Sequence, residues 1–293
     1  MDRTIWKIVF QSIRRAARRL PSPRRRPQFP DSLIVAMFLW SVWQHRPLCW
    51  ACDRSHYGAL FRPRKLPSIS QFTRRVKTWR CQQILQHVHN DLAKPHLPTS
   101  VSYLDGKSML VGPVSRDKTA RRGWVSGGTA KGYKLHAWVT EDRRIPLWSV
   151  TPLNIGEAPV AMELCRKMPM LSDNALVLAD SAYDAKYLYN LITQHNGRLL
   201  ARLKGAAEHP STLRQMGPVR REALAAWSTL PRISRWLMKS RVAVENVFSR
   251  ICSLSQLPSW VRSQPRVTRW VGGKLILYHA RLKAQQDIRP THN

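Results

Sequence analysis

The pattern of apolar residues changes abruptly near residue 95, and this change constrains the fold more than any other feature of the chain. Before it, apolar residues recur at helical spacing over residues 32–44 and 71–92. After it, runs of β-branched and aromatic residues alternate with turn residues, which is typical of strands. The Pro-containing linker Ala93–Ser100 separates the two patterns. We therefore predict a helical domain over residues 29–95 and a sheet-based domain over residues 96–290.

The second domain begins with three strand-like segments and continues with helices and strands in alternation. The strands are expected at 101–105, 132–140 and 145–152, with a hairpin turn at 141–144. The later elements are a helix at 157–168, a strand at 175–179, a helix at 184–195, a strand at 198–203, a polar insertion at about 204–239, and helices at 240–254 and 268–285. This order predicts an α/β (α+β) fold: a ribonuclease-H-like mixed sheet flanked by helices, with an N-terminal helical domain.

The charge balance indicates the kind of partner. The chain has 49 Lys and Arg against 17 Asp and Glu, a formal net charge of +32. A surface of this charge needs a polyanion, and the basic residues are spread along the whole chain. This favours double-stranded DNA over a membrane, because no single basic amphipathic helix gathers the charge. The longest apolar run, Leu33–Trp43, is too short to span a bilayer.

Residues 1–28 combine many arginines with three prolines, so we expect a basic arm that is mobile in the absence of DNA. In the helical domain that follows, Asp31 is placed to cap the first helix, and Pro67–Ser70 precedes the second. The domain resembles a helix-turn-helix unit that binds DNA or dimerises. A plain helical support for the sheet domain is the alternative.

Five cysteines, an odd and scattered set, favour a reducing compartment over a disulfide framework. Cys49 and Cys52 have the spacing of zinc ligands, and His56, His87 and His89 follow. The second half of a zinc finger is missing, so a place in the core is the favoured interpretation of these thiols and structural zinc is the alternative.

Acidic residues are scarce, and three of them stand beside apolar runs. Asp105 ends the run from Val101, Asp180 ends the run 175–179, and Glu245 lies within an apolar stretch of a predicted helix. A carboxylate at the end of a buried strand costs several kcal/mol to desolvate, by order of magnitude, unless a cation compensates it. Two Mg²⁺ ions about 3.5–4 Å apart would do so and would support in-line phosphodiester chemistry. Taken singly, such an aspartate is often a cap, and Glu245 could pair with Arg241 one turn back.

Four blocks around these acids resemble the core of bacterial insertion-sequence transposases of the DDE type. The blocks are Tyr103–Lys107, Lys131–His136, Leu178–Asp184 and Arg241–Phe248, and the resemblance covers residues 29–284. It implies a ribonuclease-H-like catalytic domain that uses Mg²⁺ or Mn²⁺, as two ions, and no organic cofactor. It also implies DNA cleavage at terminal inverted repeats and strand transfer, carried out by a homodimer or higher oligomer on element ends and target DNA. The implied location is the bacterial cytoplasm, in association with the nucleoid.

Carried over residue by residue, the resemblance makes Asp105, Asp180 and Glu245 the catalytic metal ligands and lets Arg241 hold a DNA phosphate. The related Y-x2-R-x3-E-x6-K signature is met at Arg241 and Glu245, whereas Met238 and Cys252 stand at its Tyr and Lys positions. This departure leaves the choice between a hairpin and a hydrolytic pathway open.

Basic residues near these blocks are candidates for contact with DNA. Lys134 and His136 alternate on one strand and share a face, which could meet DNA or simply be solvated. The predicted DNA-binding residues are Arg241, Lys131, Lys134, His136, Lys107, Arg74, Arg75 and Arg250. Trp124 and Tyr183 could stack on a flipped base, but a place in the core is the favoured interpretation.

Three functions fit these observations. An active transposase explains the acids, the charge and the helical domain together. A catalytically inactive or domesticated descendant that only binds DNA would have no reason to keep three carboxylates beside apolar runs. A general DNA nuclease would not need the helical domain and the basic arm.

Overall fold

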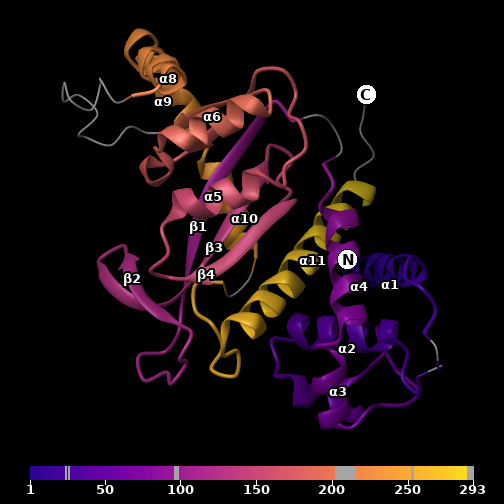
Figure 1. The fold of residues 1–293 in the computed structure, drawn as a ribbon. Coiled ribbons are helices and arrows are strands. Elements are labelled where there is room, and N and C mark those ends of the chain that lie inside the picture. Colours follow the sequence, from indigo (N-terminus) through magenta and orange to yellow (C-terminus); the bar gives the residue numbers. More distant parts are fainter. Residues whose placement is uncertain (24, 26, 96–98, 202–215, 252–253, 289–293) are drawn as a thin grey trace. The chain divides into compact units, whose positions relative to one another are not determined.

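The structure is a computed structural model that describes residues 1–23, 25, 27–95, 99–201, 216–251 and 254–288. The chain divides into two compact units. The helical unit comprises residues 1–94 and 265–293, and the sheet unit comprises residues 95–264. Figure 1 shows the helices of the first and the sheet of the second. The described helices are all too short or too polar to cross a lipid bilayer.

The helical unit is built around one almost entirely buried helix. Its helices are α1 (Asp2–Arg18), α2 (Asp31–Trp43), α3 (Ile69–Arg75), α4 (Trp79–Ala93) and α11 (Gln264–Ile288), with 3₁₀ turns η1 (Leu48–Cys52) and η2 (Arg54–His56). Every residue of α2 from Ile34 to Val42 is buried. Helix α11 approaches α2 closely at Gly273, where a Cβ atom would lie 3.1 Å from Val42 and 3.2 Å from Phe38. A side chain at this position would therefore push the two helices apart.

The first 18 residues differ from the predicted mobile arm, because residues 2–18 form α1. One face of α1 is buried through Ile5, Trp6, Val9 and Ile13, while its arginines point outward. The ring of Trp6 lies 5.1 Å from that of Trp40 in α2. The arginines therefore form the outer face of an amphipathic helix, and the buried stripe orders this segment.

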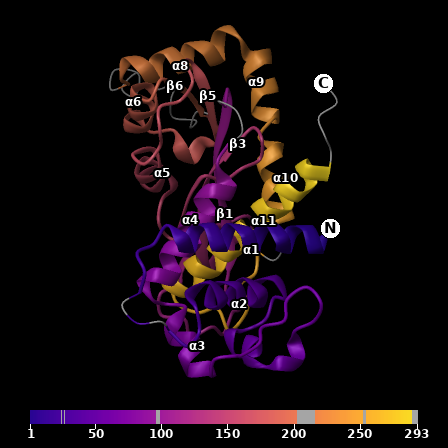
Figure 2. The ribbon, with the colours of Figure 1, turned by 90° about the vertical axis from the view of Figure 1, so that its right-hand side faces the viewer.

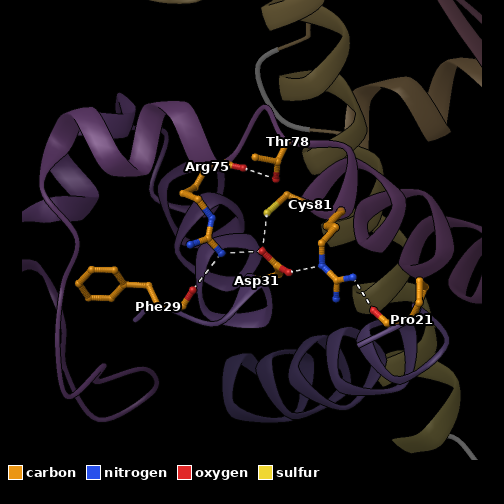
Figure 3. A network of polar contacts seen from close by, with 7 residues as sticks. Pro21, Phe29, Asp31, Arg75, Thr78 and Cys81 are labelled. Atoms are coloured by element: carbon orange, nitrogen blue, oxygen red, sulfur yellow. Dashed lines mark hydrogen bonds and ion pairs between the residues drawn. The ribbon is translucent and has the colours of Figure 1, made fainter. Parts of the chain in front are cut away.

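An aspartate ties three helices of this unit together (Figure 3). Asp31 accepts a hydrogen bond from Arg75 Nη2 at 2.6 Å and one from Arg80 Nε at 2.7 Å. Asp31 is the first residue of α2 and does not cap it, in contrast to the prediction. Burial acts to raise the pKa of Asp31, but the hydrogen bonds and charges of Arg80 and Arg75 outweigh it and lower that pKa.

The helix predicted over residues 71–92 is two helices. A capping box between Ser68 and Gln71 begins α3, and α4 begins after Thr78. The Gln82 side chain donates a hydrogen bond to the carbonyl of Val76 at 2.6 Å, which satisfies a backbone group freed by the break.

The sheet unit contains a six-stranded mixed sheet. Its strands are β1 (Val101–Leu110), β2 (Arg121–Val125), β3 (Gly128–Thr140), β4 (Leu147–Pro152), β5 (Ala175–Ala179) and β6 (Gly197–Ala201). The order is β2-β3-β1-β5-β6, and β4 also pairs with β3. Strand β1 is antiparallel to β3 and parallel to β5, which is parallel to β6. Strand β2, which the sequence did not predict, pairs with the first part of the long strand β3.

Helices cover both faces of this sheet (Figure 2). They are α5 (Glu157–Cys165), α6 (Lys186–Gln194), α8 (Pro218–Thr229), α9 (Pro231–Lys239) and α10 (Val242–Arg250), with a 3₁₀ turn η3 (Ser181–Tyr183). Helices α5 and α6 lie on one face, and α9 and α10 lie on the other. The main core contains Leu104, Trp138, Val177 and Tyr189. The predicted mixed sheet, flanked by helices and preceded by a helical region, is confirmed.

Two boundaries differ from the sequence prediction. The catalytic domain was expected to extend to residue 290, but residues 265–293 belong to the helical unit. The expected polar insertion at 204–239 contains the helices α8 and α9, whereas its residues 204–215 lie outside the described part. Both helices begin with a proline, which is favourable at the first position of a helix.

Candidate active site

The sheet register brings Asp105 and Asp180 side by side. The parallel pairing of β1 with β5 runs from Val101 opposite Leu176 to Leu104 opposite Ala179. Asp105 directly follows Leu104, and Asp180 directly follows Ala179. Because neighbouring strands lie about 4.8 Å apart, these two side chains emerge next to one another where the ladder ends. Asp105 itself stands in the middle of β1, because β1 continues to Leu110 beside β3.

Asp105 is a mostly buried carboxylate, and its side chain is 16% exposed. Its Oδ1 accepts a hydrogen bond from the amide of Gly106 at 2.9 Å and lies 3.3 Å from Nη2 of Arg241. Burial raises the pKa of Asp105 to about 6, and the charges of Asp180 and Glu157 add to the rise. Arg241 and the Gly106 amide oppose it without cancelling it. The carboxylate is therefore incompletely compensated.

Asp180 begins the 3₁₀ turn η3. Its Oδ1 accepts a hydrogen bond from the amide of Ala182 at 2.8 Å. This bond fixes the carboxylate at the end of β5. It also leads the chain into Tyr183, which is buried in the core as predicted, with 1% of its surface exposed.

Glu157 is a carboxylate near this site that the sequence analysis did not identify, and its charge acts on Asp105. It is the first residue of α5, and its Oε1 lies 2.6 Å from Nζ of Lys134. Its charge raises the pKa of both Asp105 and Tyr183. In the sequence, Glu157 has the position of an ordinary acidic residue at a helix start. The scarcity of acidic residues in this basic chain was the one signal that the sequence offered.

Glu245 lies on α10, one turn after Arg241, and its side chain is exposed. Within the described residues it has no hydrogen bond and no ion pair. Arg241 pairs with Asp105, not with Glu245, so the alternative of a simple Arg241–Glu245 pair is not found. The role of Glu245 as a third metal ligand stays a prediction.

The donor set suits a hard divalent cation, because carboxylate oxygens are the ligands that Mg²⁺ and Mn²⁺ prefer. In the described conformation no three Asp, Glu, His or Cys side chains are close enough together to hold an ion. The cationic groups of Arg241 and Lys134 lie against Asp105 and Glu157 instead.

The predicted DNA-binding residues are of two kinds. Four lie at least partly at the surface: Arg74, Lys107, Lys131 and Arg250. Arg75 forms an ion pair with Asp31 inside the helical unit, and Lys134 forms one with Glu157. His136 is 1% exposed and bonded to Thr151 at 2.9 Å, and its contact with DNA stays a prediction. Burial, followed by the charge of Lys134, lowers the pKa of His136 to about 3.

Trp124 differs from the favoured core interpretation, because 79% of it is exposed. It lies on β2 opposite Thr129 of β3. The hairpin between them turns through Gly127 and Gly128, both with positive φ. At Gly123 a Cβ atom would lie 2.4 Å from the carbonyl oxygen of Leu153, so the strand is held closely against that segment.

Two further aspartates have complete sets of partners. Asp184 is fully buried and accepts two hydrogen bonds from Arg220, at 2.8 Å to Nε and 2.7 Å to Nη2. This pair attaches α8 to the segment that follows Asp180 and Tyr183. Asp117 accepts hydrogen bonds from Tyr133, Thr119 and Ser263. Burial opposes ionisation of Asp117, but these bonds outweigh it and lower the pKa to about 2.

Cys49 and Cys52 do not form part of a zinc site within the residues that are described. Burial and the neighbouring Cys49 raise the pKa of Cys52 to about 11, whereas a zinc ligand needs a thiolate. Nδ1 of His56 lies 2.8 Å from the carbonyl oxygen of Trp50, at hydrogen-bond distance.

A mixed sheet with adjacent aspartates on neighbouring strands defines a ribonuclease-H-like domain with a carboxylate site. The family described as "Transposase DDE domain" matches residues 96–279, more than half of the chain. The protein therefore belongs to the DDE transposases, and the resemblance seen in the sequence is confirmed. A search of curated proteins finds no match to this sequence.

The comparison with solved structures returns matches of low sequence identity. One is the piggyBac transposase in a synaptic complex with hairpin DNA, with a TM-score of 0.51 and 9% identity over 98% of this chain and 73% of that one. A simian T-cell lymphotropic virus intasome in complex with the PP2A regulatory subunit B56 gamma has a TM-score of 0.22 and 14% identity, over 62% of each chain. The first supports the fold assignment, and the second is too different in structure to support it.

Proposed function

We propose that this protein is an active transposase that binds the terminal inverted repeats of an insertion sequence, cleaves DNA there and transfers the strands to a target. The adjacency of Asp105 and Asp180 is the observation that carries this proposal. Two partly buried carboxylates side by side repel one another, and burial is the main cause that raises the pKa of one of them, Asp105, to about 6. Such a pair is unfavourable for folding and is explained by a function that needs it.

Asp105 and Asp180 would hold Mg²⁺ or Mn²⁺, and two ions are expected. When bound, such ions activate a water molecule or a 3′-hydroxyl and stabilise the leaving oxygen of a phosphodiester. Glu245 is proposed as a further ligand. Residues four apart share a face of a helix, so Glu245 is on the side of α10 from which Arg241 reaches Asp105. On binding DNA, Arg241 would exchange Asp105 for a phosphate.

The hairpin of β2 and β3 is a candidate DNA contact. Trp124 is exposed there, and Arg121, Arg122, Arg116 and Lys118 are exposed around it. An exposed aromatic ring among basic residues can stack on a base while the cations contact phosphates. We expect Trp124→Ala to weaken binding to labelled element ends about fivefold or more, measured by fluorescence anisotropy. Val114→Ala, which shortens another exposed apolar side chain nearby, is the control.

The net charge of +32 is proposed to serve phosphate contact, assembly of a homodimer or higher oligomer on DNA, and association with the bacterial nucleoid. The logarithm of the affinity for DNA should then fall linearly with the logarithm of the salt concentration. An affinity that stays flat between about 50 and 200 mM salt would contradict phosphate-dominated binding.

The decisive experiment is cleavage of DNA that carries the ends of the element, in the presence of Mg²⁺. Asp180→Asn should lower the rate by about 10³-fold or more, because each metal ligand supports several kcal/mol of transition-state stabilisation. Asp173→Asn, an exposed aspartate, is the matched control. Equal rates for the parent and Asp180→Asn would instead favour an inactive, DNA-binding descendant.

A further inference from the structure

We propose that the exposed face of α3 is a further DNA contact, which binds the phosphates of duplex DNA without reading the bases. This face consists of Ser70, Thr73, Arg74 and Lys77. The inference rests on the proposed function, because it assumes that the protein binds DNA. It concerns the helical unit alone and involves no residue of the carboxylate site.

The spacing of the four side chains is the first support. Residues three and four apart are neighbours on the surface of a helix, and positions 70, 73, 74 and 77 follow this spacing. The helical turn continues past the end of α3, because the amide of Lys77 donates a hydrogen bond to the carbonyl of Arg74 at 3.2 Å. All four residues border the same open hollow in the surface, which has a volume of about 940 Å³. They therefore form one continuous surface.

The chemistry of this face suits a phosphate. The side chains of Arg74 and Lys77 are exposed, and neither forms an ion pair within the described part of the chain. Hydroxyl groups of Ser and Thr and the cations of Arg and Lys are the side-chain groups that bind DNA phosphates. Trp79, which is 60% exposed, begins α4 just beyond this face and can pack against the DNA that the cations hold.

The surrounding segment has no negative charge that could compete with DNA. Residues 54–90 include eight Lys and Arg and no Asp or Glu. Three of these cations, Arg62, Arg64 and Lys65, are exposed in the segment that leads into α3. A continuous positive surface of this kind attracts a polyanion.

The neighbouring arginines do not share this role, because they are paired inside the unit. Arg75 donates hydrogen bonds to Asp31 at 2.6 Å and to the carbonyl of Phe29 at 2.9 Å (Figure 3). Arg80 is the one Lys or Arg of α4, and it binds the same aspartate. The two adjacent arginines of α3 thus differ: Arg75 stabilises the fold, while Arg74 is left for a partner. Helix α3, and not α4, presents the cations of this part of the unit.

The test is the double substitution Arg74→Met and Lys77→Met in the full-length protein. Binding to two labelled duplexes, one with the ends of the element and one of arbitrary sequence, is followed by fluorescence anisotropy over a range of salt concentrations. We expect the affinity for both duplexes to fall about tenfold or more near 100 mM salt. The slope of log affinity against log salt should decrease in magnitude by roughly two. Both side chains are exposed, so the unfolding midpoint should stay that of the parent.

The matched control is Arg14→Met with Arg18→Met, which removes the same charge from the exposed face of α1 in the same unit. It should change the slope by clearly less than the α3 variant does. An equal loss in both variants would overturn the assignment to α3, because binding would then reflect total charge only. A loss confined to the duplex with element ends would overturn phosphate contact in favour of base reading.

The outcome is separable from that of the proposed function. If Asp180→Asn loses cleavage while the α3 variant binds both duplexes like the parent, only the role of α3 is overturned. If Asp180→Asn cleaves DNA at the rate of the parent, the proposed function is wrong, and a weaker affinity of the α3 variant would still establish the contact.

Discussion

Asp31 in the helical unit and Asp105 in the sheet unit are both largely buried and both contact arginines, yet their environments have opposite effects. Two arginines bind Asp31 at 2.6 and 2.7 Å, and its pKa is lowered. One arginine approaches Asp105 at 3.3 Å while two other carboxylates lie nearby, and its pKa is raised to about 6. The first arrangement stabilises the ionised fold. The second leaves a deficit of positive charge, which is what a metal site needs.

The largest expected effect comes from Asp105→Asn. DNA cleavage with Mg²⁺ should fall by about 10³-fold or more, while the metal-free protein should be at least as stable as the parent. Stability should not fall because the substitution removes an incompletely compensated buried charge. Cleavage kinetics and urea unfolding in EDTA measure the two quantities. A large loss of stability would show that Asp105 is a structural residue like Asp31.

Asp184→Asn should have the next largest effect, on stability. It removes the partner of Arg220 from a pair whose carboxylate is fully buried, so the free energy of unfolding should fall by about 3–4 kcal/mol. Urea unfolding followed by circular dichroism checks this. An unchanged unfolding midpoint would show that the Asp184–Arg220 pair does not stabilise the fold. It would then contradict the view that Asp184 and Asp31 differ from Asp105 because their charges are fully paired.

Asp31→Asn should destabilise the helical unit by a smaller amount, about 2 kcal/mol, because its two arginines are partly exposed and can rehydrate. DNA cleavage at a temperature well below unfolding should stay close to that of the parent. The exposed Asp2→Asn is the control for the loss of one negative charge. If Asp31→Asn lost as much DNA cleavage as Asp105→Asn, the distinction between a structural Asp31 and a catalytic Asp105 would not hold.

The smallest expected effect is in the pH dependence of stability without metal. The folded pKa of Asp105, about 6, lies above its unfolded value of about 3.9, so the folded state holds this proton more tightly between these pH values. The contribution of Asp105 to stability should therefore fall as the pH rises from about 4 to 6, by at most about 2 kcal/mol. The difference between parent and Asp105→Asn, measured in EDTA, isolates this term. A constant difference over this range would contradict it.

Several parts of the fold could be predicted from the sequence, because local pattern and tertiary structure agree there. Strand β5 has the predicted bounds 175–179, since a short apolar run between turn residues has few other solutions. Asp105 and Asp180 were found because acids are rare in this chain and these two stand beside apolar runs.

Other features depend on contacts that pattern alone does not reveal. The arginines of residues 1–28 suggested disorder, but the interleaved Ile5, Trp6 and Val9 form a buried face of α1. His136 appeared to share a surface with Lys134, whereas its side chain is buried and bonded to Thr151 of the neighbouring strand β4. Glu157 is distant in sequence from both aspartates. Only the folded position of α5 brings it to them.

The make-up of the helical unit has a consequence for synthesis of the protein on the ribosome. This unit takes residues 1–94 from the beginning of the chain and residues 265–293 from its end. Until α11 has been translated, the faces of Phe38 and Val42 that receive Gly273 stay uncovered. A nascent or prematurely terminated chain would therefore expose apolar surface that aggregates or attracts chaperones. The ribosome must translate the whole sheet unit, residues 95–264, before α11 is available to complete the core of the helical unit.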